Sequence, residues 1–279
     1  MRTQSTLTLA GRCVAWLEVG DPDGLPVLYC HGTPGSRLDA ADYDQWATWA
    51  GLRLVAPDRP GWGRSPYRPW ASHSDWAADA EAVMERAGAG DAFAVIAVSG
   101  GGPFGFAVAA SMPDRVLRLA LASAVGPAPT RADRRAFGWK GRAGLSRTGF
   151  SVRSAINAVL VPLLHKDLGT ELPAELPAEV TRAEIRAEWL AQKSAAYLDE
   201  NRHALDWTFP LTDVICPVRA WQGDRDPLAP AELLENLRGR VADLALCRVP
   251  GGHFAPYERL EEIFKWLKDG ADPEVGAKP

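Results

Sequence analysis

The sequence has few of the features that mark metal-binding, nucleic-acid-binding or membrane proteins. Its 4 cysteines lie far apart with no Cys-x-x-Cys spacing, which predicts buried thiols and argues against a zinc or redox site. The formal net charge is −4 and no block of Lys and Arg is present, so we expect no nucleic-acid partner. No apolar run is long enough to span a membrane, and the apolar stretch before Gly11 is too short for a signal peptide. These absences predict a cytoplasmic protein with no metal, no cofactor and no membrane partner.

Length and apolar spacing favour one large α/β domain. A chain of 279 residues buries a substantial core and has room for an insertion. Strand-like runs bounded by Gly, Pro or Asp alternate with helical stretches, which predicts a largely parallel sheet with ligands at its carboxyl edge. The expected strands are 6–9, 13–19, 26–30, 52–56, 95–98, 116–124, 218–221 and 244–249; the expected helices are 40–49, 75–86 with Ser74 as its N-cap, 104–112 and 257–267.

One predicted strand ends at a serine. In Val95-Ile-Ala-Val-Ser-Gly-Gly-Gly-Pro103 the apolar run stops at Ser99, and a helix can begin directly after it. Such a turn strains the serine backbone and needs small residues two positions before and after, here Ala97 and Gly101. The usual pattern is Gly-x-Ser-x-Gly, so Ala97 departs from it by one methyl group. The segment predicts a nucleophile elbow, although a serine among glycines is more often an ordinary turn.

Two downstream residues complete a chemical set with Ser99. A serine hydroxyl needs a base and a carboxylate that orients the base. Asp226 ends Gly223-Asp-Arg-Asp226 after one predicted strand, and His253 follows Pro250-Gly-Gly after the next. We therefore predict His253 as general base and Asp226 as its partner, with Asp224 the alternative carboxylate. The chain order Ser, Asp, His differs from the orders of the chymotrypsin and subtilisin folds.

The loop Cys30-His-Gly-Thr-Pro-Gly-Ser36 follows another predicted strand. A developing oxyanion needs preorganised N–H donors, and we assign them to the backbone amides of Thr33 and Gly100. His31 is a candidate substrate contact, but bracing the loop by hydrogen bonding is the more economical interpretation.

These motifs together resemble α/β-hydrolase fold serine hydrolases. The resemblance rests on His31-Gly-Thr-Pro-Gly35, Asp58-Arg-Pro-Gly-Trp-Gly-Arg-Ser65, Ala97 to Gly101, Gly223 to Asp226 and Gly252-His-Phe254. It implies an α/β class fold with an eight-stranded, mostly parallel sheet, helices on both faces and an inserted helical cap. It also implies an architectural role for Asp58, Arg59 and Arg64, with Trp62 left as a pocket candidate.

The resemblance divides the chain into a core at 1–125 and 213–269, a cap at 126–212 and a flexible tail at 270–279. Phe137 and Trp139 in the cap and Phe254 beside His253 are candidate substrate contacts. Glu179, Glu184 and Glu188 are spaced to bind an amine or carboxylate, but such spacing more often marks a solvated helix face.

The predicted reaction is acyl transfer through a serine ester of a small, apolar carboxylic ester or lactone. A carbon–carbon bond hydrolase remains an alternative because such an enzyme uses the same serine, histidine and aspartate. An iminopeptidase-like enzyme is disfavoured by Gly100, since that family tends to carry Trp after the nucleophile. A non-hydrolytic acyltransferase or cyclase is the hypothesis from another class. A small-molecule substrate is the expected partner, and a homodimer is left open.

Overall fold

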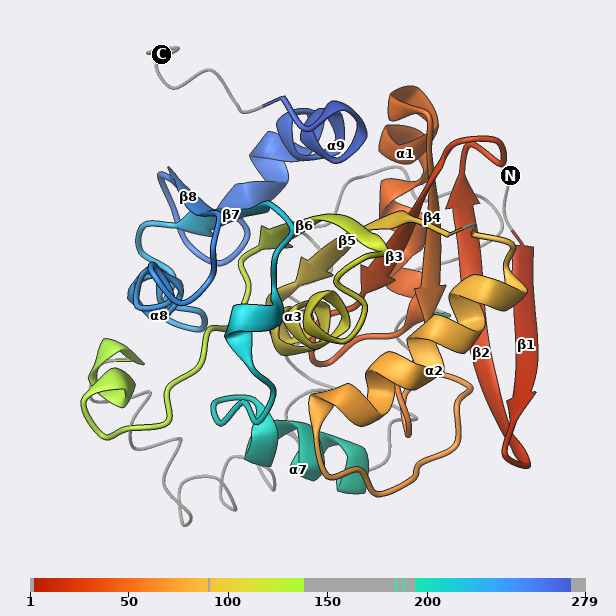
Figure 1. Cartoon of the computed structure of the whole chain (residues 1–279), viewed down its shortest axis with the longest axis horizontal. Helices are drawn as coiled ribbons and strands as arrows, with labels where there is room; N and C mark the ends of the chain where they lie inside the picture. The colour runs from red at the N-terminus through yellow and green to blue at the C-terminus, as the bar shows by residue number, and fades with distance from the viewer. Residues whose placement is uncertain (1–2, 90, 138–183, 185–187, 189–193, 272–279) are drawn as a thin grey trace.

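The computed structural model describes residues 3–89, 91–137, 184, 188 and 194–271 (Figure 1). Eight strands form one sheet in the order β1-β2-β4-β3-β5-β6-β7-β8. The pairs β1–β2 and β2–β4 are antiparallel, and every pair from β4–β3 to β7–β8 is parallel. The strands are β1 (Thr3–Leu9), β2 (Arg12–Gly20), β3 (Leu25–Cys30), β4 (Leu52–Pro57), β5 (Phe93–Val98), β6 (Val116–Ala122), β7 (Val218–Gly223) and β8 (Leu244–Val249).

Helices cover both faces of this sheet. The longer α-helices are α2 (His73–Arg86), α3 (Gly102–Ser111), α7 (Ser194–His203) and α9 (Leu260–Asp269), and the shorter ones are α1 (Asp44–Ala50) and α8 (Ala231–Glu235). Short 3-10 helices are η1 (Arg37–Tyr43), η2 (Ser99–Gly101), η3 (Asp133–Phe137), η4 (Leu211–Asp213) and η5 (Ala255–Arg259). In Figure 1, α1 and α9 lie on one side of the sheet, and α2 and α3 lie on the other.

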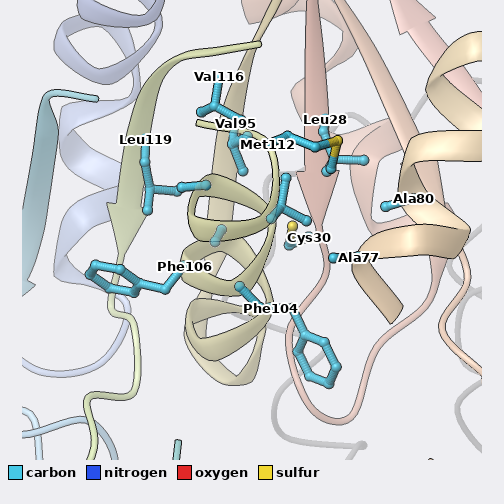
Figure 2. Packing of buried hydrophobic residues seen from close by; sticks show 14 of the residues in the cluster. Leu28, Cys30, Ala77, Ala80, Val95, Phe104, Phe106, Met112, Val116 and Leu119 are labelled. Atoms are coloured by element: carbon cyan, nitrogen blue, oxygen red, sulfur yellow. The ribbon is translucent and has the colours of Figure 1, made fainter. Parts of the chain in front are cut away.

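Burial on both faces explains the continuous apolar runs of the central strands. Every residue of β5 is buried, as expected for a parallel strand with helices above and below it. One core cluster joins α2 and α3 to the sheet, and Figure 2 shows Phe104 and Phe106 of α3 in this cluster together with Val95 and Leu28 from the strands. A second cluster joins η1, α1 and α9 to the opposite face.

The predicted α/β fold with an eight-stranded, mostly parallel sheet is confirmed. Several local predictions differ from the structure, and the predicted helix at 40–49 is the 3-10 helix η1 followed by α1 from Asp44. Helix α2 is capped by Ser72 instead of Ser74, because the Ser72 amide donates to the Asp75 carboxylate at 3.2 Å. The predicted helix at 257–267 begins as the 3-10 turn η5 and becomes α-helical at Leu260.

The predicted cap and tail fall mostly outside the described residues. Between 126 and 212 the structure describes η3, α7, η4, Glu184, Glu188 and the segments beside them, and the tail is described only at 270 and 271. The cap therefore stays a prediction. None of the helices in the described ranges has the length and apolarity needed to cross a bilayer.

The cysteines are only partly as predicted. All four are thiols outside any disulfide; Cys30 and Cys216 are buried, but Cys13 and Cys247 are half-buried. Burial raises the pKa of the Cys30 thiol to about 12, so Cys30 stays protonated and unreactive despite its place beside the loop of His31.

His73 makes the fold sensitive to acid. It is buried against Phe104 and Phe209, and its Nε2 atom has no hydrogen-bond partner within the described part of the chain. Burial, with smaller contributions from His203 and Arg59, lowers its pKa to about 3. Between about pH 3 and about pH 6.5 the unfolded chain binds a proton here that the folded protein does not, so the free energy of unfolding falls by about 1.4 kcal/mol per pH unit below about 6.5.

We expect His73→Phe to reduce this acid sensitivity, because Phe keeps the ring contacts and does not titrate. Urea unfolding of wild type and variant at about pH 7.5 and about pH 5.5 measures it; the loss of stability on acidification is expected to be about 1 kcal/mol smaller in the variant. An equal loss in both proteins contradicts the assignment.

Candidate active site

Ser99 lies at the turn between β5 and α3 in a strained conformation. Its φ is +51°, the left-handed region that non-glycine residues rarely adopt. The Val125 amide donates to the Ser99 carbonyl at 3.0 Å, which fixes the turn against the segment that follows β6. The predicted strand–serine–helix turn is therefore present, and its strain presents the hydroxyl at the carboxyl edge of the sheet.

The packing around this turn explains why Ala97 replaces the usual glycine. A Cβ atom on Gly105 of α3 would lie 2.7 Å from the Ala97 Cβ atom, so the strand and helix approach closely here. The methyl group of Ala97 is therefore accommodated by the absence of a side chain at position 105. Gly101 is needed for a different reason, since a Cβ there would overlap the backbone carbonyl of Cys30.

His253 and Asp226 lie in line with the Ser99 hydroxyl. His253 Nε2 is 3.0 Å from Ser99 Oγ, and His253 Nδ1 is 2.7 Å from Asp226 Oδ2. The Asp226 side chain is fully buried, and the His253 side chain is 14% exposed. Backbone amides of Leu228 and Ala229 donate to the other oxygen, Asp226 Oδ1, at 2.8 and 3.1 Å. Because Oδ1 is held by the backbone, Oδ2 stays aimed at the imidazole.

Asp224, the alternative carboxylate, is used elsewhere. It is exposed, and its Oδ1 accepts a hydrogen bond from the Gly251 amide at 2.8 Å. This hydrogen bond is the main cause of the lowered pKa of Asp224. Asp224 therefore fastens the loop that carries His253, whereas the imidazole is hydrogen-bonded to Asp226.

Ser123 is a residue of this site that the sequence analysis missed. It follows β6 with φ +49°, and its hydroxyl donates a short hydrogen bond to the His253 carbonyl. Its own amide donates to the Trp221 carbonyl at 2.9 Å. The only signal in the sequence is a serine among small residues at a predicted strand end, which does not point to a partner 130 residues away.

Thr33 and Gly100 lie against each other beside the serine. A Cβ on Gly100 would overlap the Thr33 side chain, and a Cβ on Gly32 would lie 3.6 Å from the Ser99 Cβ. The loop after β3 therefore packs directly on the turn after β5. This arrangement brings the two backbone segments predicted to form an oxyanion hole together, and it leaves no room for a side chain at position 100.

His31 braces this loop. It is fully buried; its Nδ1 lies 2.9 Å from the Gly32 carbonyl, and its Nε2 accepts from the Arg59 amide at 3.4 Å. These partners require one protonated and one bare ring nitrogen. Burial, with Arg59 nearby, holds the pKa of His31 well below its usual value, so the ring is neutral.

The other predicted substrate contacts have mixed outcomes. Trp62 is fully buried and packs on His31 and Arg59. The buried ring of His31 agrees with the preferred bracing role, and a substrate contact by either residue stays a prediction. Phe137 is half-buried on a small cluster around Leu205. Trp139 lies outside the described residues. Phe254 is 47% exposed beside the His253 ring and remains a candidate.

Glu188 is not a solvated residue. Its carboxylate lies 2.7 Å from the buried guanidinium of Arg37, which also pairs with Asp58 at 2.8 Å. Burial raises the pKa of Asp58 to about 6, opposed by Arg37. The solvated position expected of Glu188 is therefore wrong, because its side chain is 15% exposed and pairs with an arginine of η1. Glu184 is exposed, and Glu179 lies outside the described residues.

Comparison with known proteins agrees with this geometry. The sequence model of the alpha/beta hydrolase fold family matches residues 26–144. A non-heme chloroperoxidase of Streptomyces lividans is 35% identical over 131 residues, which cover 45% of this chain and 46% of that protein. A proline iminopeptidase of Neisseria gonorrhoeae is 35% identical over 111 residues, covering 39% and 35%. The matches thus span less than half the length of these relatives.

Solved structures match over nearly the whole chain. A thermophilic esterase from Thermogutta terrifontis has 20% identity and a TM-score of 0.64, covering 97% of each chain. A hydrolase from Pseudomonas aeruginosa has 18% identity and a TM-score of 0.69, covering 96% of this chain and 99% of that one. At such identities the likeness extends to the fold. With the strand order and the family match, it shows that the chain has the α/β-hydrolase fold.

The close contact between Ala97 and Gly105 yields a prediction on stability. Gly105→Ala places two methyl groups 2.7 Å apart, and we expect it to lower the free energy of unfolding by about 1–3 kcal/mol. Adding Ala97→Gly removes the opposing methyl and is expected to restore most of this loss. The contact with Leu119 Cδ1 at 3.1 Å prevents a full recovery. Urea unfolding of both single variants and the double variant measures the coupling between positions 97 and 105. If the two changes in the free energy of unfolding simply add, the close contact between these positions is contradicted.

Proposed function

We propose that the protein is a serine hydrolase that cleaves a small carboxylic ester or lactone through an acyl-enzyme. The observation that carries this proposal is the line of hydrogen bonds from Ser99 Oγ to His253 Nε2 at 3.0 Å and from His253 Nδ1 to Asp226 Oδ2 at 2.7 Å. Ligand binding alone needs neither a strained serine nor a base held by a buried carboxylate.

The reaction follows from these positions. His253 Nε2 takes the proton from Ser99 as Oγ attacks the carbonyl carbon, while the Thr33 and Gly100 amides hold the oxyanion. The leaving alcohol takes that proton from His253, and the acyl group stays on Ser99. Water, deprotonated by His253, then attacks the acyl carbon, and His253 returns the proton to Ser99 Oγ as the acid leaves. Asp226 holds the imidazole in the tautomer that each step needs.

Two features favour an ester over a substrate with a free amine. An amine needs an accessible carboxylate, but Glu188 and Glu200 are each paired with a buried arginine. Position 100 has no space for a side chain beside Thr33, in keeping with the predicted departure from the iminopeptidases. A serine at position 99 also disfavours an epoxide hydrolase or a haloalkane dehalogenase, because these enzymes use an aspartate nucleophile.

We also propose that residues 126–212 form a cap over the site. Hydrolysis and acyl transfer would both use Ser99, His253 and Asp226, and they differ in the molecule that accepts the acyl group. Water gives hydrolysis, and an alcohol or amine gives acyl transfer. Because one relative is named a chloroperoxidase, hydrogen peroxide belongs among the acceptors tested. Product analysis with p-nitrophenyl acetate and each acceptor distinguishes these outcomes, and a carbon–carbon hydrolase would show little turnover with any of them.

The first test of the nucleophile is intact-mass labelling with a fluorophosphonate. We expect one adduct per chain in the wild type, as the Ser99 oxygen bonds to phosphorus and fluoride leaves. Ser99→Ala is expected to show no adduct, and His253→Ala to label at least about 100-fold more slowly. Equal labelling of wild type and Ser99→Ala would refute the assignment.

Asp226 and Asp224 offer a matched pair for the carboxylate. Asp226→Asn replaces the carboxylate that accepts from His253 Nδ1 with an amide, which favours the wrong tautomer of the imidazole. We therefore expect kcat for p-nitrophenyl acetate to fall by about 10³- to 10⁴-fold. Asp224→Asn keeps the oxygen that accepts from Gly251 and is expected to stay within about fivefold of wild type. The reverse pattern would make Asp224 the orienting carboxylate.

A further inference from the structure

Arg59 occupies an unusual position behind the Thr33 loop. It is 1% exposed, and its guanidinium donates to the carbonyls of His31 and Gly32 at 2.5 and 2.9 Å and to Thr33 Oγ1 at 3.1 Å. One side chain thus contacts three consecutive residues of the loop. The guanidinium also lies 4.5 Å from the ring centre of Phe104, a residue of the helix that follows Ser99.

Glu200 closes this network from α7. Its carboxylate accepts from Arg59 Nε at 2.5 Å and Nη2 at 3.1 Å, and from Thr33 Oγ1 at 2.7 Å. Glu200 is 4% exposed, so both charges are shielded from water. The hydroxyl hydrogen of Thr33 is committed to Glu200, which leaves the backbone amide as the group that Thr33 can offer to an oxyanion.

The geometry of the peptide bond connects this network to the site. A trans peptide is planar, and its C=O and N–H point in opposite directions. The Gly32 carbonyl and the Thr33 amide belong to one such unit. Arg59 Nη2 and His31 Nδ1 each lie 2.9 Å from that carbonyl oxygen. Fixing the oxygen at one edge of the peptide plane therefore fixes the direction of the Thr33 N–H at the opposite edge.

We propose that Arg59 and Glu200 are positioning residues that aim the Thr33 amide into the oxyanion hole. Arg59 sets the peptide plane, and Glu200 holds Arg59 and the Thr33 side chain in register. The inference rests on the proposed function, since it assigns a role within the same reaction. It places the control of one oxyanion donor in a residue of α7, distant in sequence from the loop it serves.

The chain contains a matched control for Glu200. Arg37 is also 1% exposed and pairs with Glu188 through contacts of 2.9 and 2.7 Å. In the described part of the chain, neither residue forms a hydrogen bond or ion pair with residues 31–33. Glu188→Gln and Glu200→Gln therefore each remove one negative charge from a buried arginine. Only Glu200→Gln changes the partner of Arg59, which holds the Gly32 carbonyl.

The test compares the two variants with wild type in fluorophosphonate labelling, separating the maximal rate kinact from the binding constant KI. We expect Glu200→Gln to lower kinact by about 10- to 100-fold, up to the cost of losing an oxyanion donor, with KI within about threefold. The Ki of phenylboronic acid, whose tetrahedral adduct on Ser99 uses the same hole, should rise in parallel. Glu188→Gln should leave all three values within about threefold.

Each other outcome counts against the inference. An unchanged kinact in Glu200→Gln, a change confined to KI, or an equal loss in Glu188→Gln would overturn it. A wild type that labels at Ser99 keeps the proposed function even when the positioning role fails, whereas an unlabelled wild type removes both. If Glu200→Gln does not fold, Arg59→Lys takes its place, because an ammonium cannot reach both carbonyls and the carboxylate together; its kinact is expected to fall in the same way.

Discussion

The left-handed backbone of Ser99 is the constraint on which the surrounding structure depends. A non-glycine residue at φ +51° costs on the order of 1–3 kcal/mol and persists only where its neighbours enforce it. Here the enforcement is steric and polar. Gly105 lets β5 approach α3, Gly101 lets the end of β3 approach the turn, and the amide of Val125 holds the serine carbonyl. The glycines around the serine are therefore consequences of the turn, and the methyl group at position 97 is accommodated because position 105 has none.

The sheet topology brings the remaining groups to the same edge. The parallel strands β3, β5, β6, β7 and β8 end side by side, and their following loops carry Thr33, Ser99, Ser123, Asp226 and His253 in that order. Residues far apart in the chain thus lie within hydrogen-bond reach because the strands share one direction. Ser123 illustrates the dependence: its hydroxyl holds the His253 carbonyl only because β6 and the loop after β8 end at the same level.

Sequence reasoning succeeded where a residue's role is encoded by its own neighbours. The strands, the turn at Ser99 and the order of the three polar residues all follow from local patterns, and the structure brings these residues together. It failed where the partner comes from another element. Glu188 has the spacing of a solvated face, yet it pairs with a buried arginine of η1. Trp62 resembles a pocket aromatic, but the folding of its own turn buries it completely. Neither outcome can be derived from spacing along one helix or loop.

Two of the buried arginines, Arg37 and Arg59, explain how the segment around α7 is joined to the core. Arg37 pairs with Asp58 and Glu188, and Arg59 pairs with Glu200. Buried ion pairs add little net stability, because desolvation of the charges offsets their attraction, but a misplaced charge there is strongly unfavourable. Such pairs therefore fix the position of the carboxylate more sharply than apolar packing does. An oxyanion donor needs that kind of constraint, since a small rotation of its peptide plane turns the N–H away from the reacting atom.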